Sequence, residues 1–300
     1  MAALRGGRPM KEGEMRVSVI QMSPGADKEA NIAAAERLIG EACKEDRPEL
    51  VSLPEMWMSL GGDRERRFAN AESLPPPGSE APTAGAEAYE TLRRLARHHR
   101  IFIHGGSLIE KDEAERGRLF NTTVLFDPEG REIARYRKIH LFDITAPDGT
   151  GYRESATYGA GEAIVTARCG AFVAGLSICY DIRFPELYQA LRLAGAEVIF
   201  VPAAFTLQTG KDHWEVLLRA RAIETQCWIV AAATFGRFEE RGEPRATYGH
   251  AMIVDPWGQV VAMVPDGVGF ATARLDRARL ARIRRDMPVI EHRRPHLWGR

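Results

Sequence analysis

The chain has 300 residues, of which 45% are hydrophobic, enough to build one large domain or two of ordinary size. Lysine plus arginine equals aspartate plus glutamate at 41 each, so its charge gives no reason to expect nucleic acid or a membrane surface as a partner. No apolar run approaches the roughly 18 residues of a membrane span, and the four cysteines form no C-x-x-C pair. We therefore expect a cytoplasmic enzyme with reduced thiols, and a zinc finger or a thioredoxin-like site has little support.

The first half of the chain alternates strand-like and helix-like segments. Residues 1–14 lack the apolar stretch of a signal peptide and are expected to form a disordered lead, with one folded domain over 15–300. Hydrophobic periodicity then predicts strands at 16–22, 50–55 and 101–106, helices at 31–43 and 87–99, and a hairpin at 121–136 with an Asp-Pro-x-Gly turn.

The second half repeats this order. The same reasoning predicts strands at 172–179, 198–205 and 228–236, helices at 185–195 and 213–226, and a hairpin at 250–264. Both hairpins contain Asp-Pro-x-Gly, and a proline stops the strand in both 50–55 and 198–205. One such turn alone could match by chance, but the ordered match of several elements indicates an internal duplication.

Alternating apolar strands and helices indicate sheets that are covered by helices. Two such halves are expected to stack sheet against sheet, which gives an α/β fold of the four-layer α-β-β-α sandwich type, internally pseudo-duplicated. No composition break or long linker separates the halves, so a single domain is predicted. The basic tail, from about 277 to 300, is expected to pack on a neighbouring element or a second subunit.

Four residues at the ends of predicted strands are candidates for chemistry, because reacting groups gather at the carboxyl ends of strands in α/β folds. Each alone is weak evidence, since a cysteine after an apolar strand is more often inert packing than a nucleophile. Cys179, however, is followed by a helix start, whose N–H groups stabilise a thiolate or an oxyanion. The four candidates are Glu55, Lys138, Glu154 and Cys179.

A cysteine nucleophile needs a base that takes its proton. Histidine is the usual base, and His140 and His250 lie near strand ends, but nothing in the local sequence marks either one. A buried glutamate can do the same work, because desolvation raises the pKa of a carboxyl by up to about 3–5 units. The residue pattern alone leaves both bases open.

Several segments resemble motifs of the nitrilase superfamily of carbon–nitrogen hydrolases, in order and over residues 15–298. They include LPEMW, YRKIHLFD, YRESATYGAGE, ICYDIRFPE, AGAEVIFVPAAF, TGKDHWEVLLRARAIETQCWIVAAA, YGHAMIVDPWG and MPVIEHRRPHLW. The resemblance implies the sandwich fold, a thioester acyl-enzyme mechanism, no metal or organic cofactor, and a homodimer or larger homo-oligomer.

The resemblance also implies a role for each candidate. Glu55 is expected to be the general base and Cys179 the nucleophile. Lys138 and the backbone N–H of Tyr180 are expected to stabilise the tetrahedral intermediate. Glu154 is expected to position substrate and the lysine.

The residues after the cysteine, Tyr180 and Asp181, resemble the amidase-type branch. HWEVLLRARAIETQC and HRRPHL resemble the enzymes that act on deaminated glutathione, whereas HLFDI, RES and FTLQTG are similar to ω-amidases. Both act on small amides that carry a carboxylate, so we expect amide hydrolysis with release of ammonia. A substrate carboxylate needs a cation, and Arg183 is the candidate, with a structural ion pair to Asp181 or Glu186 as the alternative.

Three further residues, Phe205, Thr206 and Gln208, follow a predicted strand and are expected to line the substrate pocket. Two other readings of the function stay open. The same triad could hydrolyse nitriles or N-carbamoyl compounds, although Tyr180-Asp181 disfavours a nitrile. A catalytically silent interaction protein is the reading from a different class, against which the four motif residues weigh.

Overall fold

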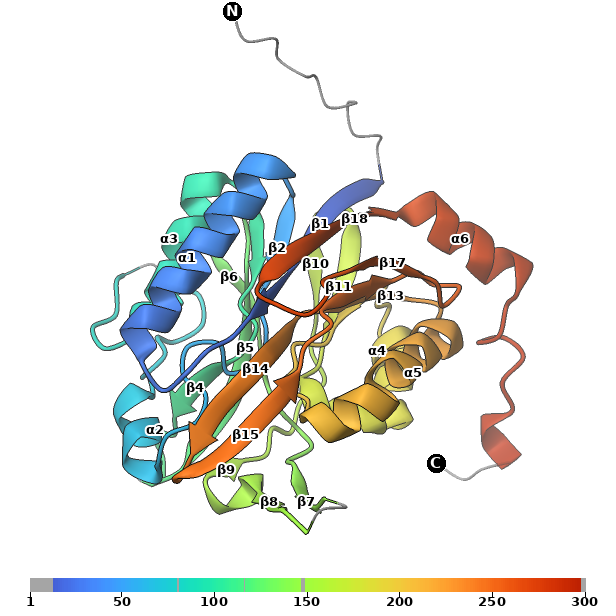
Figure 1. Ribbon diagram of the computed structural model, residues 1–300. Helices are drawn as coiled ribbons and strands as arrows, with labels where there is room; N and C mark the ends of the chain where they lie inside the picture. Colours follow the sequence, from blue (N-terminus) through green and yellow to red (C-terminus); the bar gives the residue numbers. More distant parts are fainter. Residues whose placement is uncertain (1–12, 80, 116, 147–148, 298–300) are drawn as a thin grey trace, which may run out of the picture.

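Two β-sheets pack face to face, and helices cover the outer face of each sheet (Figure 1). The computed structural model describes residues 13–79, 81–115, 117–146 and 149–297. The predicted four-layer α-β-β-α sandwich is therefore confirmed. No helix within these ranges is long and apolar enough to cross a membrane.

Strand alternation explains the layers. In β1 (Glu14–Met22), Val17 and Val19 join the apolar cluster between the two sheets, whereas Ile20 and Met22 join the cluster beneath the helices. A strand buried on both faces must be apolar on both, which is why the central strands show nearly continuous hydrophobic runs.

The first sheet has ten strands and is covered by the helices α1 (Lys28–Glu45) and α3 (Glu87–His99). Its parallel centre is β1-β2-β3, followed by the antiparallel pair β5-β6. The short helix α2 (Arg64–Asn70) follows the loop after β2. The strands after β1 are β2 (Leu50–Ser52), β3 (Phe102–His104), β4 (Leu108–Lys111), β5 (Leu119–Phe126), β6 (Glu132–Arg137), β9 (Tyr158–Gly159), β14 (Ala233–Glu240), β15 (Glu243–Tyr248) and β18 (Gly269–Asp276).

The second sheet has six strands and is covered by α4 (Pro185–Leu193) and α5 (Leu207–Thr225). Its parallel centre, β11-β12-β13, is followed by the antiparallel pair β16-β17. A separate two-stranded sheet pairs β7 (Asp143–Thr145) with β8 (Gly151–Arg153). The six strands are β10 (Thr166–Cys169), β11 (Phe172–Leu176), β12 (Val198–Phe200), β13 (Trp228–Ala231), β16 (Met252–Val254) and β17 (Val260–Met263).

Both sheets have the same strand order, three parallel strands followed by an antiparallel hairpin, as the predicted duplication requires. Both hairpins turn at the Asp-Pro-x-Gly sequence. Gly130 donates its N–H to the carbonyl of Asp127, and Gly258 donates to Asp255, each at 2.8 Å. Two type I turns with glycine last therefore occupy equivalent positions in the two halves.

Several predicted strands are longer than those of the structure. The strands predicted at 50–55, 101–106 and 198–205 end at Ser52, His104 and Phe200. Two further strands differ as well. The segment 228–236 is two strands, since the chain leaves the second sheet after Ala231 and enters the first sheet at Ala233. Three consecutive small, buried alanines, at 231–233, line this crossing. The strand predicted at 172–179 ends at Leu176, and Cys179 instead begins a 3-10 helix, Cys179–Arg183.

The outer helix α5 begins six residues before the prediction. The side chain of Thr206 caps it by accepting a hydrogen bond from the N–H of Thr209. Trp214 and Leu218 are buried on its inner face, whereas Val216 and Ile223 are exposed.

The basic tail packs on its own domain through α6 (Arg277–Asp286). Leu280 and Ile283 are buried, and Arg284 donates hydrogen bonds to the carbonyls of Ala196 and Gln226 at 2.8 and 3.1 Å. Of the expected N-terminal lead, residues 1–12 lie outside the described residues, and Glu14 already belongs to β1.

Candidate active site

Glu55 is buried at the carboxyl end of β2, three residues after the strand ends. It is 3% exposed, and its two carboxylate oxygens have separate partners. Oε1 accepts hydrogen bonds from the Asn121 amide at 2.8 Å and from Lys138 Nζ at 3.0 Å, while Oε2 accepts from the N–H of Ala204 at 2.8 Å. These contacts join the first sheet to the loop after β12, so the carboxylate has a fixed orientation.

Lys138 follows β6 directly and is 2% exposed. Its Nζ lies 3.0 Å from Glu55 and 2.9 and 3.1 Å from the two oxygens of Glu154. Burial by itself would lower the pKa of this ammonium, but the charges of Glu154 and Glu55 outweigh it and raise the pKa well above its usual value. The side chain is therefore a permanent cation between two carboxylates.

Glu154 starts the 3-10 helix Glu154–Ala156 and orients the lysine. Besides Lys138, its carboxylate accepts hydrogen bonds from the N–H of Phe142 at 2.6 Å and from the Asn121 amide at 3.3 Å. The Asn121 amide thus connects both glutamates.

Cys179 begins its 3-10 helix with a φ of 48°, a left-handed conformation that is uncommon for a residue other than glycine. Its N–H donates to the Pro202 carbonyl at 2.9 Å, which anchors the residue to the loop after β12. Burial and the neighbouring Glu55 carboxylate, which accepts a hydrogen bond from the thiol, raise the pKa of Cys179 well above its usual value. Lys138 and the Ala204 N–H act in the opposite direction. The resting side chain is a protonated thiol beside a carboxylate.

Asp181 determines the shape of the turn that carries the nucleophile. It is fully buried, and its carboxylate accepts hydrogen bonds from the N–H of Ile178 at 2.8 Å and the Tyr136 hydroxyl at 2.6 Å. It also bonds the N–H and Nδ1 of His140, at 3.0 and 2.7 Å. His140 thus serves the turn, and its ring stacks on Phe184. The group that contacts the thiol is Glu55 rather than a histidine.

Tyr180, the expected oxyanion donor, is the second residue of this 3-10 helix and lines the cavity beside Cys179. The first N–H groups of a helix have no partner within the helix, so they are available to a bound oxyanion.

A cavity of about 360 Å³ opens above the four side chains. Of the residues expected in the substrate pocket, Arg183, Phe205 and Thr206 line it. Gln208 is exposed in the first turn of α5 and does not line the cavity, whereas Thr209 does. Helical geometry explains the difference, because position 209 lies one turn from Thr206 and 208 does not.

Arg183 makes no ion pair with Asp181 or Glu186 in the structure. Its guanidinium lies over the rings of Tyr180 and Phe205, 5.9 and 5.4 Å from their centroids. Both terminal nitrogens lie 3.3 Å from Nδ1 of His213. Among the described residues no carboxylate forms a salt bridge with it, so the alternative of a structural ion pair is not formed.

The sequence reasoning missed three parts of the site. It did not select Asn121, although this asparagine opens the strand-like segment NTTVLF. It did not identify Asp181 as the anchor of the turn. It also missed the hairpin β14-β15, whose Arg241-Gly242 tip has positive φ values of 54° and 79°, a typical signal of a two-residue hairpin turn.

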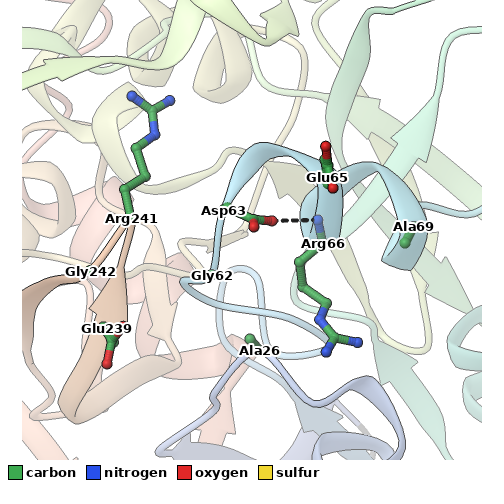
Figure 2. A pocket seen from close by; sticks show the side chains of 9 residues that line it. All are labelled: Ala26, Gly62, Asp63, Glu65, Arg66, Ala69, Glu239, Arg241 and Gly242. Atoms are coloured by element: carbon green, nitrogen blue, oxygen red, sulfur yellow. Dashed lines mark hydrogen bonds between the residues drawn. The ribbon is translucent and has the colours of Figure 1, made fainter.

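A second, more open depression of about 750 Å³ lies beside this hairpin tip (Figure 2). Asp63 caps α2 there through the N–H of Arg66 at 2.8 Å, and Arg241 points away from both. No cysteine, serine or histidine lines it, so we assign the chemistry to the cavity at Cys179. Within the described residues, no group of three His, Cys, Asp or Glu side chains is arranged to hold a metal ion.

The chain is similar to several known proteins. A Synechocystis protein named deaminated glutathione amidase is 43% identical over 279 residues, which cover 92% of this chain and 97% of that protein. The human protein of the same name is 40% identical over 288 residues, covering 94% and 83%. The crystal structure of Saccharomyces cerevisiae Nit3, a member of branch 10 of the nitrilase superfamily, is 30% identical with a TM-score of 0.80, covering 92% and 95%. Residues 16–285 match the carbon-nitrogen hydrolase family, and the chain belongs to that family.

Proposed function

We propose that this chain is an amidase that cleaves a carbon–nitrogen bond through a thioester on Cys179. The observation that carries the proposal is the buried group of Glu55, Lys138 and Cys179, in which a protonated thiol touches a carboxylate beside a permanent cation. A thiol with a raised pKa reacts only when a base removes its proton during attack, and Glu55 is the carboxylate in contact with it.

The first half of the reaction forms the acyl-enzyme. Glu55 accepts the thiol proton as the sulfur of Cys179 attacks the amide carbonyl carbon. The negative charge on the carbonyl oxygen is stabilised by the ammonium of Lys138 and the N–H of Tyr180. The carbon–nitrogen bond then breaks, and the leaving nitrogen takes the proton from Glu55, which restores the carboxylate.

The second half hydrolyses the thioester. Glu55 accepts a proton from a water molecule as the oxygen of that water attacks the thioester carbon. When the carbon–sulfur bond breaks, the sulfur takes that proton back, and a carboxylic acid leaves the site.

We propose deaminated glutathione as the substrate, supported by the names of the relatives at 40–43% identity. This compound has an α-keto acid at one end and cysteinylglycine on the other side of the scissile amide. Its leaving group is the amine of the dipeptide, so the expected release of ammonia applies only to a primary amide such as α-ketoglutaramate.

We assign the carboxylate of the acyl half to Arg183, with Phe205 and Thr206 beside it. The guanidinium lines the cavity and has no carboxylate partner among the described residues, so a substrate carboxylate would be its counter-ion.

The test is mass spectrometry of the enzyme mixed with deaminated glutathione, together with an assay of cysteinylglycine release. We expect a 2-oxoglutaryl adduct on Cys179 and free dipeptide, and the Cys43→Ala variant serves as the control for other thiols. Turnover of neither deaminated glutathione nor α-ketoglutaramate would refute the substrate, and turnover of nitriles or N-carbamoyl compounds instead would support the alternative reading.

We also propose a homodimer that forms through α5. Val216 and Ile223, two helical turns apart on one face, are 67% and 52% exposed, and Trp257 in the adjacent β16-β17 turn is 51% exposed. Arg219 Nε donates to the carbonyl of Gly258 at 2.8 Å, which holds this turn against the helix. Light scattering should give the mass of two chains, and Val216→Glu with Ile223→Glu should give one.

We propose a cytoplasmic location, which the four free thiols support. Fractionation of cells that express the protein tests this, and enrichment in a membrane or extracellular fraction would contradict it.

A further inference from the structure

The hairpin β14-β15 presents one face to the catalytic cavity. Phe238 pairs with Arg245 and Glu240 pairs with Glu243 across the two antiparallel strands. Side chains two residues apart on a strand share a face, and Thr247 continues the same row. All five of these side chains line the cavity, so the hairpin forms one wall of the substrate site.

Backbone contacts hold this wall at both ends. At the tip, the N–H of Gly62 donates to the Glu239 carbonyl at 2.8 Å, and the N–H of Arg241 donates to the Gly62 carbonyl at 3.2 Å. At the base, the N–H of Tyr248 donates to the Phe205 carbonyl at 2.9 Å. The wall is therefore tied to the loop that follows Glu55 and to the loop that carries Phe205.

Arg245, a side chain of this wall, has a hydrogen-bond donor without an acceptor in the described part of the chain. Its Nε is buried, and among the described residues nothing accepts a hydrogen bond from it. The nearest carboxylate, Glu240, lies 3.8 Å away and already forms a shorter bond of 2.7 Å with Arg67. A buried donor without an acceptor is unfavourable, and an anionic ligand in the cavity would supply the acceptor.

An aromatic row separates Arg245 from Arg183. The guanidinium of Arg245 lies over the Tyr152 ring, 5.6 Å from its centroid. Tyr152 contacts Phe142 at 5.0 Å between centroids, and Phe142 contacts Tyr180 at 5.1 Å. Arg183 then lies over Tyr180. Arg245 and Arg183 thus lie at opposite ends of a row of three aromatic rings, each of which contacts the next.

We infer that Arg245 binds the carboxylate at the far end of the leaving group and so selects amides with an acidic tail over simple primary amides. This inference rests on the proposed function, which assigns Arg183 to the acyl end. A substrate with a carboxylate at each end and a thiol-bearing residue between them matches two cations separated by aromatic rings, since sulfur makes favourable contacts with aromatic rings. Arg67, Arg153 and Arg241 also line the cavity, and Glu240 and Glu243 partly offset their positive charge.

The test compares two substrates that differ in one group. The first is deaminated glutathione, and the second is the same compound with its terminal carboxylate converted to a carboxamide. The readout is the ratio of kcat/KM for the first to kcat/KM for the second. In the wild type we expect a ratio of about 10 to 100, the effect of one hydrogen-bonded charge pair, and in Arg245→Gln a ratio near 1.

Two further variants keep the result interpretable. Arg237 lies on the same hairpin, is exposed and does not line the cavity, so Arg237→Gln should keep the wild-type ratio. Arg245→Lys keeps the charge without the planar fork, and its ratio should lie between those of the wild type and Arg245→Gln.

A ratio near 1 in the wild type would overturn the role of Arg245, and so would a ratio in Arg245→Gln equal to that of the wild type. In either case, hydrolysis of both compounds would leave the proposed function standing. Hydrolysis of neither compound by the wild type would overturn both.

Discussion

Lys138 and Glu55 form an ion pair that is almost completely shielded from water, with 3.0 Å between Nζ and Oε1 and side chains 2% and 5% exposed. The same ammonium contacts Glu154 at 2.9 Å, so one cation compensates two carboxylates. Such a group stabilises little compared with an apolar core, but removal of one member leaves uncompensated buried charge.

Lys138→Met should therefore lower the free energy of unfolding by about 3–5 kcal/mol, the usual cost of breaking a buried pair. Chemical denaturation measures this change. Lys44→Met makes the same substitution at an exposed position of α1 and should change the stability by less than about 0.5 kcal/mol. Equal effects of the two substitutions would show that the pair is not the source.

Glu55→Gln should change turnover and thiol ionisation in opposite senses. Turnover should fall by about 10²–10⁴-fold, because the base for both half-reactions is lost. The pKa of Cys179 should fall, because the Glu55 carboxylate helps to hold it above its usual value, after burial. The measurement is the pH dependence of iodoacetamide labelling, made in a Cys43→Ala background. Cys43 is removed because burial raises its pKa to about 11, so its slow labelling would overlap with that of Cys179. An unchanged or higher midpoint in Glu55→Gln would contradict the assignment.

Gly106 passes directly behind the loop that carries Glu55. Its φ is 63°, and a Cβ at this position would lie 2.1 Å from the Pro54 carbonyl oxygen. Gly106→Ala should move this loop and reduce kcat/KM by about 10²-fold, the cost of misplacing a catalytic group by about 1 Å. Steady-state kinetics gives the readout. Gly78 also has a positive φ, 82°, but nothing lies within 4 Å of its Cβ position, so Gly78→Ala isolates backbone strain and should keep near-normal activity.

His104 should make the fold sensitive to acid. Its ring is fully buried between the sheets, bonded to Ser52 and Thr123 at 2.9 and 3.0 Å and stacked on Phe200. Burial lowers its pKa to about 3 from 6.5. Between these two pH values the unfolded chain binds a proton that the folded chain does not. Stability should therefore fall as the pH drops below about 6.5, by about 1.4 kcal/mol for each pH unit.

Urea denaturation of the wild type and His104→Gln at pH 7, 6 and 5 tests this. From pH 7 to pH 5 the wild type should lose about 2 kcal/mol more than the variant. The comparison uses slopes, so any constant loss of stability in the variant cancels. Parallel curves would show that His104 does not titrate on unfolding.

Local patterns were sufficient for the fold class and for selecting candidate residues at strand ends, whereas their roles came from the resemblance to a family. Helix α3, at Glu87–His99, has the predicted bounds, because a helix with one apolar face is specified by residues three and four apart. The Asp-Pro-x-Gly turns were equally clear, since proline and glycine restrict backbone angles directly. Glu55, Lys138 and Cys179 were found because each follows a strand, and strand ends meet in this type of fold.

The sequence by itself thus determined the order of the main strands and helices, the duplication and the candidate residue types of the site, because these depend on neighbours along the chain. Only the tertiary structure decided which groups meet. Asn121 reaches Glu55 across 66 positions, and the Ala204 N–H reaches it across 149. The strand at 228–236 divides between two sheets, and Gln208 turns away from the cavity. Only the tertiary structure shows that Nε of Arg245 has no acceptor among the described residues, because whether a buried donor is satisfied depends on the packing of the two sheets and the hairpin around it.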